Sequence, residues 1–171
     1  MQTESAAKLE ETITDSSAES AATVQFLTFT LGKEEYGVDI MMVREVKGWS
    51  ETTRLPNTPD YIRGVLNLRG IIIPIFDLRA RFGGGLTEAT EKNVVIILAV
   101  GERTIGILAD TVSDILTVPT GDIKTSPDTN ATDIDDKFVN GLIAVEERMV
   151  VLLDISILLA NDMDKIGEQD A

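Results

Sequence analysis

Short apolar segments, separated by turn residues, fill the chain between residues 24 and 160. Valine, isoleucine and leucine dominate these segments, which favours β-strands. Single strands are expected at Val24–Leu31, Tyr36–Ile40, Arg44–Trp49 and Thr111–Val118. Hairpins are expected where Gly64–Leu68 meets Ile71–Phe76, Val94–Val100 meets Thr104–Ala109, and Phe138–Val145 meets Arg148–Leu153. Such closely spaced strands predict an all-β sandwich or barrel with a few short helices.

Two aspartates stand between a predicted strand and a short apolar segment. Asp77 precedes Leu78–Phe82, and Asp154 precedes Ile155–Ala160. An aspartate carboxylate accepts hydrogen bonds from the free N–H groups of a first helical turn. We therefore expect both aspartates to cap short helices, in preference to a catalytic role.

Segments without large apolar residues mark the borders of the folded part. Residues 1–23 are rich in Ser, Thr, Ala and Glu, and predict a disordered N-terminal tail. Residues 161–171 predict a short acidic C-terminal tail. The polar segment Thr125–Asp136 predicts a loop, and Gly83–Gly85 predicts a flexible link. The folded domain is thus expected to span residues 24–160.

The second half of the folded part resembles the first half. The pairs that lie 69 residues apart are Gly32 and Gly101, Gly37 and Gly106, Val43 and Val112, and Glu45 and Asp114. The pairs that lie 77 residues apart are Gly64 and Gly141, and Asp77 and Asp154. Hairpins often look alike, but several independent positions agree here. The pattern predicts two similar small barrels, intertwined, at approximately 24–85 and 86–160.

Charge and composition exclude several classes of function. The net charge of −14 disfavours binding to nucleic acid or to an anionic membrane surface. The absence of Cys and His removes disulfides, thiolate metal sites and the commonest general base. The longest apolar run, Val94–Val100, is too short to span a bilayer, and no signal peptide is visible, so we expect a cytoplasmic protein.

The motifs of common active sites are missing from the sequence. No phosphate-binding or dinucleotide-binding glycine pattern is present, and Asp128–Asp136 lacks the glycine and glutamate of a calcium loop. We therefore expect no catalytic residues, no metal site and no cofactor, and a protein that binds other proteins. A carboxylate-based β-barrel enzyme or ligand binder that uses Asp77 or Asp114 remains an alternative.

The segment Gly64–Arg79 carries the most specific motif, Gly-Val-Leu-Asn-Leu-Arg-Gly-Ile-Ile-Ile-Pro-Ile-Phe-Asp-Leu-Arg. This segment resembles the signature of the CheW family of chemotaxis adaptors. Phe29–Val38, Leu55–Gly64 and Gly106–Leu116 resemble neighbouring parts of that family. The resemblance covers roughly residues 23–160.

The resemblance implies two packed SH3-like barrels, each with five strands. It implies a non-enzymatic scaffold that couples chemoreceptors (methyl-accepting chemotaxis proteins) to the regulatory domain of the CheA histidine kinase. A protein with these partners is recruited to membrane receptor arrays without entering the membrane. Within this family, the adaptor module of CheV, a fragment of CheA and an adaptor of another chemosensory pathway are alternatives.

The resemblance also implies a receptor-binding groove between the barrels. The residues carried over to it are Val43, Glu45, Gly64, Asn67, Arg69 and Val112. Plainer interpretations exist for four of these residues. Val43 and Val112 are alternatively core residues, and Gly64 is alternatively needed only for its backbone conformation. Arg69 is alternatively a solvated turn residue or an internal partner of Glu45.

The kinase contact implied by the family involves one end of each barrel. The residues carried over to it are Arg44, Val46, Trp49 and Lys124. Family members can carry an aromatic residue in the loop after Lys124, where this chain has Thr129. The second kinase contact therefore lacks the apolar anchor that usually contributes strongly to an interface.

Overall fold

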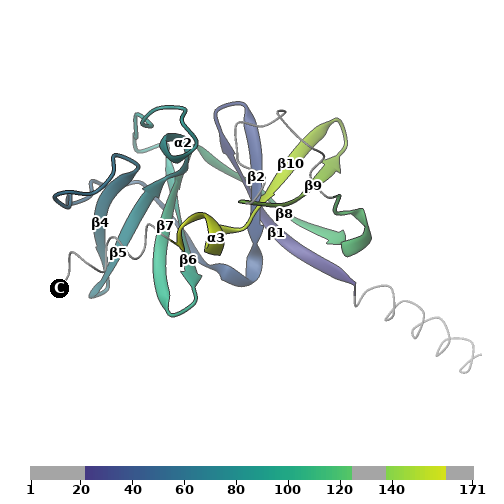
Figure 1. Cartoon of the computed structure of the whole chain (residues 1–171), viewed down its shortest axis with the longest axis horizontal. Helices are drawn as coiled ribbons and strands as arrows, with labels where there is room; N and C mark the ends of the chain where they lie inside the picture. The colour runs from purple at the N-terminus through teal and green to yellow at the C-terminus, as the bar shows by residue number, and fades with distance from the viewer. Residues whose placement is uncertain (1–21, 125–137, 161–171) are drawn as a thin grey trace, which may run out of the picture.

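The computed structural model describes residues 22–124 and 138–160 (Figure 1). Ten strands form two five-stranded sheets, and the helices are short, so the all-β prediction is confirmed. Thr23, which the sequence placed in the N-terminal tail, begins the first strand instead. Residues 1–21, the loop Thr125–Asp136 with Thr129, and the C-terminal tail lie outside the described residues.

One sheet, here called the terminal barrel, takes its strands from both ends of the folded chain. Its order is β8 (Thr111–Pro119), β1 (Thr23–Leu31), β2 (Glu34–Asp39), β10 (Arg148–Leu153) and β9 (Val139–Val145). Neighbouring strands are antiparallel except for the parallel pair β2 and β10. A bridge between Lys124 and Leu142 joins the segment after β8 to β9, at the opposite edge of the sheet.

The other sheet, here called the central barrel, is built from the middle of the chain. Its order is β3 (Val43–Gly48), β6 (Val94–Val100), β7 (Arg103–Ala109), β5 (Ile71–Asp77) and β4 (Ile62–Leu68). Only β5 and β7 are parallel. A bridge between Thr53 and Val65 closes this barrel in the same way.

The expected division between residues 85 and 86 does not match these sheets. Under the sequence repeat, β1–β5 correspond to β6–β10, and the two strand orders become the same. Each repeat contributes two strands to one barrel and three to the other, because the chain crosses between sheets at the 3-10 turn η1 (Ile40–Met42). The physical reason is that equivalent strands from the other copy satisfy the same backbone hydrogen bonds, as in domain swapping.

The two sequence repeats share details of local geometry as well as the order of their strands. Asp77 and Asp154 have φ angles of −94° and −95°, and their carboxylates accept hydrogen bonds from Ala80 N and Ile157 N. They therefore cap α2 (Leu78–Arg81) and α3 (Ile155–Leu158), as expected. Both β3 and β8 carry a register shift at equivalent positions, and so do the hairpins β4–β5 and β9–β10.

The two barrels share one large core. A buried cluster contains Phe29 and Val38 from the terminal barrel together with Ile96 and Ile107 from the central barrel. Each barrel adds a smaller apolar cluster of its own. Close packing across both sheets makes the two barrels one unit, since neither sheet buries its apolar residues alone.

A cut in the exposed glycine link between the repeats tests this strand exchange. We expect a protein cleaved at a protease site inserted beside Gly85 to elute from a sizing column as one species under native conditions. The reason is that each barrel contains strands from both fragments. The fragments should separate only in denaturant, and separation in native buffer would contradict the exchange.

Candidate functional site

Strand β3 presents different residues on its two faces. Val43, Glu45 and Lys47 are half-buried, whereas Arg44 and Val46 are exposed. The strand lies at one end of the strand order and has β6 as its neighbour in the sheet. Alternation places Glu45 and Lys47 on one face of the strand and Val46 on the other, whereas the register shift between Val43 and Glu45 interrupts the alternation at Arg44.

The two valines predicted to line the groove occupy equivalent places at the margin of the shared core. Val43 pairs with Leu98 in the central barrel, and Val112 pairs with Phe29 in the terminal barrel. Both are half-buried and pack against the shared core cluster. The structure thus gives each valine a packing role and leaves part of each side chain accessible.

The β4–β5 hairpin turns through Arg69 and Gly70. Their φ angles of +52° and +85° are those of a tight two-residue turn that follows the twist of the strands. The Asn67 side-chain oxygen accepts a hydrogen bond from Gly70 N at 2.9 Å. Asn67 therefore shapes the turn, and the turn projects Arg69 away from the sheet.

Arg69 forms an ion pair with Glu45, so the hairpin tip is joined to strand β3. The Arg69 side chain is 72% exposed and that of Glu45 is 32% exposed. An ion pair with this exposure contributes at most about 1 kcal/mol to stability. The structure brings Glu45, Asn67 and Arg69 together at one surface, where the pair can exchange its partners for those of a bound protein at little cost.

Gly64 has a backbone role in the closure of the central barrel. Its φ angle is +127°, and a Cβ atom at this position would lie 2.4 Å from the Thr53 carbonyl oxygen. The next residue, Val65, exchanges both backbone hydrogen bonds with Thr53, at 2.8 and 3.0 Å. Gly64 is buried and is not part of the surface formed by Glu45 and Arg69.

Replacement of Gly64 should therefore destabilise the fold. We expect Gly64→Ala to lower the free energy of unfolding by roughly 2 kcal/mol, because a Cβ clashes with backbone at a positive φ. Gly48→Ala is the matched control, since no atom lies within 4 Å of its Cβ position, and it should change stability by less than about 0.5 kcal/mol. Chemical denaturation measures both, and equal effects would refute the steric explanation.

The residues predicted for the kinase contact fall on both barrels. Arg44 and Val46 are exposed on β3, and Val46 is 42% exposed. Trp49 follows the strand and packs, half-buried, against the small cluster of the central barrel. Lys124 lies on the terminal barrel, where its backbone pairs with Leu142. The first three residues thus lie along one segment, and Lys124 belongs to the other barrel.

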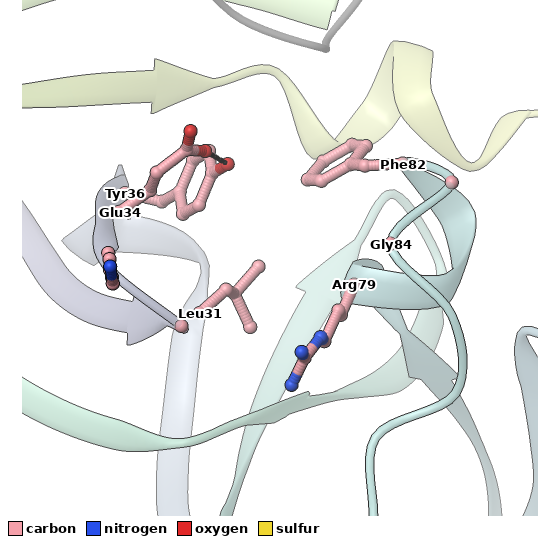
Figure 2. A pocket seen from close by; sticks show the side chains of 9 residues that line it. Leu31, Glu34, Tyr36, Arg79, Phe82 and Gly84 are labelled. Atoms are coloured by element: carbon pink, nitrogen blue, oxygen red, sulfur yellow. Dashed lines mark hydrogen bonds between the residues drawn. The ribbon is translucent and has the colours of Figure 1, made fainter.

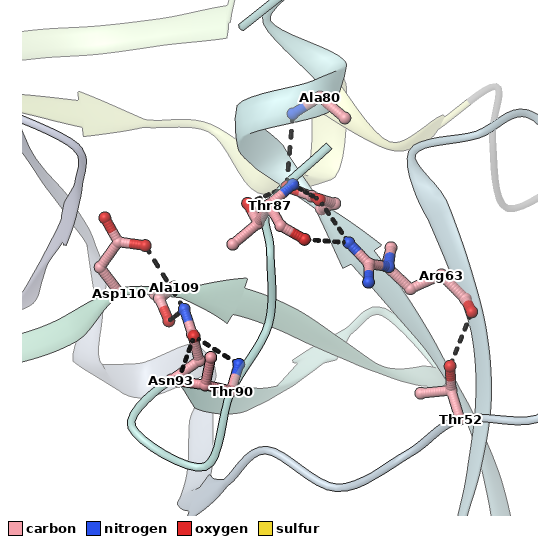
Figure 3. Close-up of polar contacts among 9 residues, drawn as sticks. Thr52, Arg63, Ala80, Thr87, Thr90, Asn93, Ala109 and Asp110 are labelled. Atoms are coloured by element: carbon pink, nitrogen blue, oxygen red, sulfur yellow. Dashed lines mark hydrogen bonds and ion pairs between the residues drawn. The ribbon is translucent and has the colours of Figure 1, made fainter. Parts of the chain in front are cut away.

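A buried polar network around Asp77 was missed from the sequence. The Asp77 side chain is fully buried. Figure 3 shows Arg63, Ala80 and Thr87, which donate hydrogen bonds to its carboxylate. One carboxylate oxygen accepts from Ala80 N and Thr87 Oγ1, and the other accepts from Thr87 N at 2.7 Å and Arg63 Nη1 at 3.1 Å. Arg63 Nη1 also donates to the Thr87 carbonyl at 2.6 Å. Helix capping explains only one of these bonds.

The network fixes the connection after α2 to strands β4 and β5. The signal that could have revealed it is an arginine at Arg63, where the equivalent position in the second repeat is Asn140. The Asp77 side chain is closed off from solvent, and both of its carboxylate oxygens are engaged in this network. Asp114, the other carboxylate considered, accepts a hydrogen bond from Ile115 N, and its own N–H donates to Thr28.

The two capping aspartates offer a paired test of this network. We expect Asp77→Ala to lower the free energy of unfolding by roughly 3–5 kcal/mol, because it leaves Arg63 without its buried partner. Asp154→Ala removes a cap from a half-buried position and should cost about 1 kcal/mol. Denaturant titration of both variants measures the difference, and similar losses would show that Asp77 is only a cap.

A cavity lies between the β1–β2 turn and helix α2. It encloses about 660 Å³, and Figure 2 shows Leu31, Glu34, Tyr36, Arg79 and Phe82 around it. The Tyr36 hydroxyl donates a hydrogen bond to Glu34. Within the described residues no group of three or more acidic side chains is placed to hold a metal ion, and no helix is long and apolar enough to cross a membrane.

Comparisons with known proteins place the chain in a family. The model of the CheW-like domain matches residues 25–163. Chemotaxis protein CheW of Klebsiella aerogenes is 46% identical over 138 residues, which cover 81% of this chain and 82% of that protein. Chemotaxis protein CheW of Rhizobium meliloti is 43% identical over 131 residues, which cover 77% and 84%. The crystal structure of the scaffolding protein TtCheW from Thermoanaerobacter tengcongensis matches with a TM-score of 0.73 and 32% identity, over 80% of this chain and 87% of that chain. The family resemblance is thereby confirmed, and the chain belongs to the CheW-like domain family.

Proposed function

We propose that the chain is a non-enzymatic scaffold that couples chemoreceptors to the CheA histidine kinase in chemotaxis. The observation that carries this proposal is the match across both barrels to proteins named chemotaxis protein CheW and to a protein named as a scaffold. The exposed ion pair on the hairpin of the family signature supports it, because an adaptor needs accessible recognition groups. Recruitment to membrane receptor arrays follows from binding to the receptors.

The receptor surface is proposed to combine apolar and charged contacts. Val43 and Val112 offer one accessible aliphatic side chain from each barrel, and the Arg69 guanidinium offers a planar fork of donors. The tip of a receptor helix would bury its apolar positions against the valines and place polar groups near Arg69. The exposure of the Glu45–Arg69 pair supports this role, since Arg69 is held in position and remains accessible.

The kinase surface is proposed to lie around Arg44, Val46 and Trp49, along strand β3 and the segment that follows it. A bridging protein needs a receptor surface and a kinase surface that can be occupied at the same time. Lys124 on the terminal barrel would provide a second contact with the regulatory domain of another kinase molecule. Two contacts on different barrels would allow rings of alternating adaptor and kinase.

An Arg69→Glu variant tests the coupling function directly. Kinase autophosphorylation is measured with receptor-containing membranes, with and without receptor ligand, in the presence of each protein. With the wild-type chain, we expect kinase activity to change when receptor ligand is added. With Arg69→Glu, this change should be at least about ten-fold smaller, because repulsion from Glu45 displaces the new side chain. The unfolding free energy should change by at most about 1 kcal/mol.

Lys92→Glu is the control, since it makes the same change in charge at an exposed residue away from the hairpin. It should retain the full ligand response. If the Arg69→Glu variant still couples kinase activity to receptor ligand, Arg69 does not belong to the receptor surface. A wild-type chain that neither binds the kinase nor changes its activity would contradict the proposed function itself.

A further inference from the structure

A small polar cavity opens beside the end of strand β3, next to the proposed kinase surface. It encloses about 270 Å³ and is lined by Trp49, Glu51, Thr52, Arg54 and Arg63. A tryptophan and two arginines in one concave site are the residue types that contribute most to protein interfaces. The cavity is therefore a candidate anchor site for a side chain of a bound protein.

Arg63 is held rigidly at the base of this cavity. Its guanidinium carbon lies 5.5 Å from the centroid of the Trp49 ring, and its Nη1 atom is bound to Asp77 and to the Thr87 carbonyl. The Thr52 hydroxyl donates to the Arg63 carbonyl at 2.7 Å, as Figure 3 shows. All of the side-chain hydrogen bonds shown for Arg63 use Nη1, so Nε and Nη2 remain for a ligand. The side chain is 22% exposed and needs little reorganisation to bind.

The equivalent positions of the terminal barrel carry other residues. Arg63 lies at a register shift between β4 and β5, and the equivalent shift between β9 and β10 carries Asn140, which is exposed. The position equivalent to Trp49 is Val118, which is buried. The repeated fold therefore requires the irregular strand but not the arginine or the tryptophan. Bulges of this kind frequently re-aim a side chain toward a functional site.

The charges in the cavity favour an acidic ligand. Arg54 is exposed, and no hydrogen bond or ion pair involves it among the described residues. The charge of Arg63 is balanced by Asp77, and Arg63 also lines the cavity. The chain as a whole carries a net charge of −14. Two neighbouring guanidinium groups make a local exception, and guanidinium binds carboxylates well. Glu51 is the one acidic residue that lines the cavity.

We propose that this cavity receives a carboxylate side chain of the CheA regulatory domain, with Arg54 and the free nitrogens of Arg63 as donors and Trp49 as the wall. The inference rests on the proposed function, since it names the group that the kinase surface would bind. It assigns Arg63 two roles: its Nη1 atom neutralises buried Asp77, and its remaining donors face the partner. Asp77 and Thr87 then act as positioning residues, because they hold Arg63 without touching the partner.

Calorimetric titration of CheA into the full chain tests the proposal with two variants that should change the affinity in opposite directions. We expect Arg54→Glu to weaken binding by at least about ten-fold, because it replaces a donor with a repelling charge. Glu51→Gln should tighten binding by about two-fold to three-fold, because it removes the repulsion inside the cavity. Arg79→Glu is the matched control: it makes the same change in charge at another exposed arginine and should leave the affinity unchanged. Binding to receptor-containing membranes should be the same for all variants.

The outcomes separate this inference from the function on which it rests. A wild-type chain that binds CheA, together with an Arg54→Glu variant of equal affinity, would overturn the cavity assignment and leave the scaffold function intact. Equal weakening by Arg54→Glu and Arg79→Glu would also overturn it, since general electrostatics would then suffice. No binding of CheA to the wild-type chain would refute the kinase contact itself. Arg54 and Glu51 are exposed, so thermal unfolding should show all variants folded.

Discussion

The exchange of strands between the two repeats is the constraint on which the rest of the structure depends. Each barrel needs strands from both halves of the chain, and the largest apolar cluster belongs to both barrels. A small barrel alone has little core, and the shared cluster supplies what each lacks. Because the barrels cannot move apart without exposing this cluster, Val43 and Val112 are held at a fixed spacing on the two sides of their junction.

The family signature combines several physical tasks in one hairpin. Gly64 allows the backbone contact that closes the barrel, and Asn67 shapes the turn. Arg69 reaches the surface, where its pair with Glu45 keeps it in position. Asp77 ends the segment in a buried network that fixes the following connection. The backbone tasks explain why this short stretch is specific enough to identify the family, and they leave Arg69, Ile71 and Ile72 widely exposed.

The sequence pattern predicts most of the strands and helices, but it does not predict which strands pair or which side chains contact one another. The strands, the three hairpins and both capped helices were predicted because alternation, turn residues and capping are local signals. The division into barrels was wrong, since equivalent strands of two similar repeats have the same pattern and either one can complete a sheet. The Arg63–Asp77 network was missed because an N-cap already explains the aspartate. For Arg69, the sequence favoured a contact with a partner and left the internal pair with Glu45 as an alternative.

The register of strand β3 against β6 decides which of its side chains share a face of the sheet. Side chains alternate along it, so a slip by one residue against β6 would exchange the face with Glu45 for the face with Val46. The extra residue between Val43 and Glu45, where the pairing with β6 shifts, therefore sets the phase of the whole strand. An insertion or deletion of one residue there would turn the side chains on one side of the shift to the opposite face of the sheet.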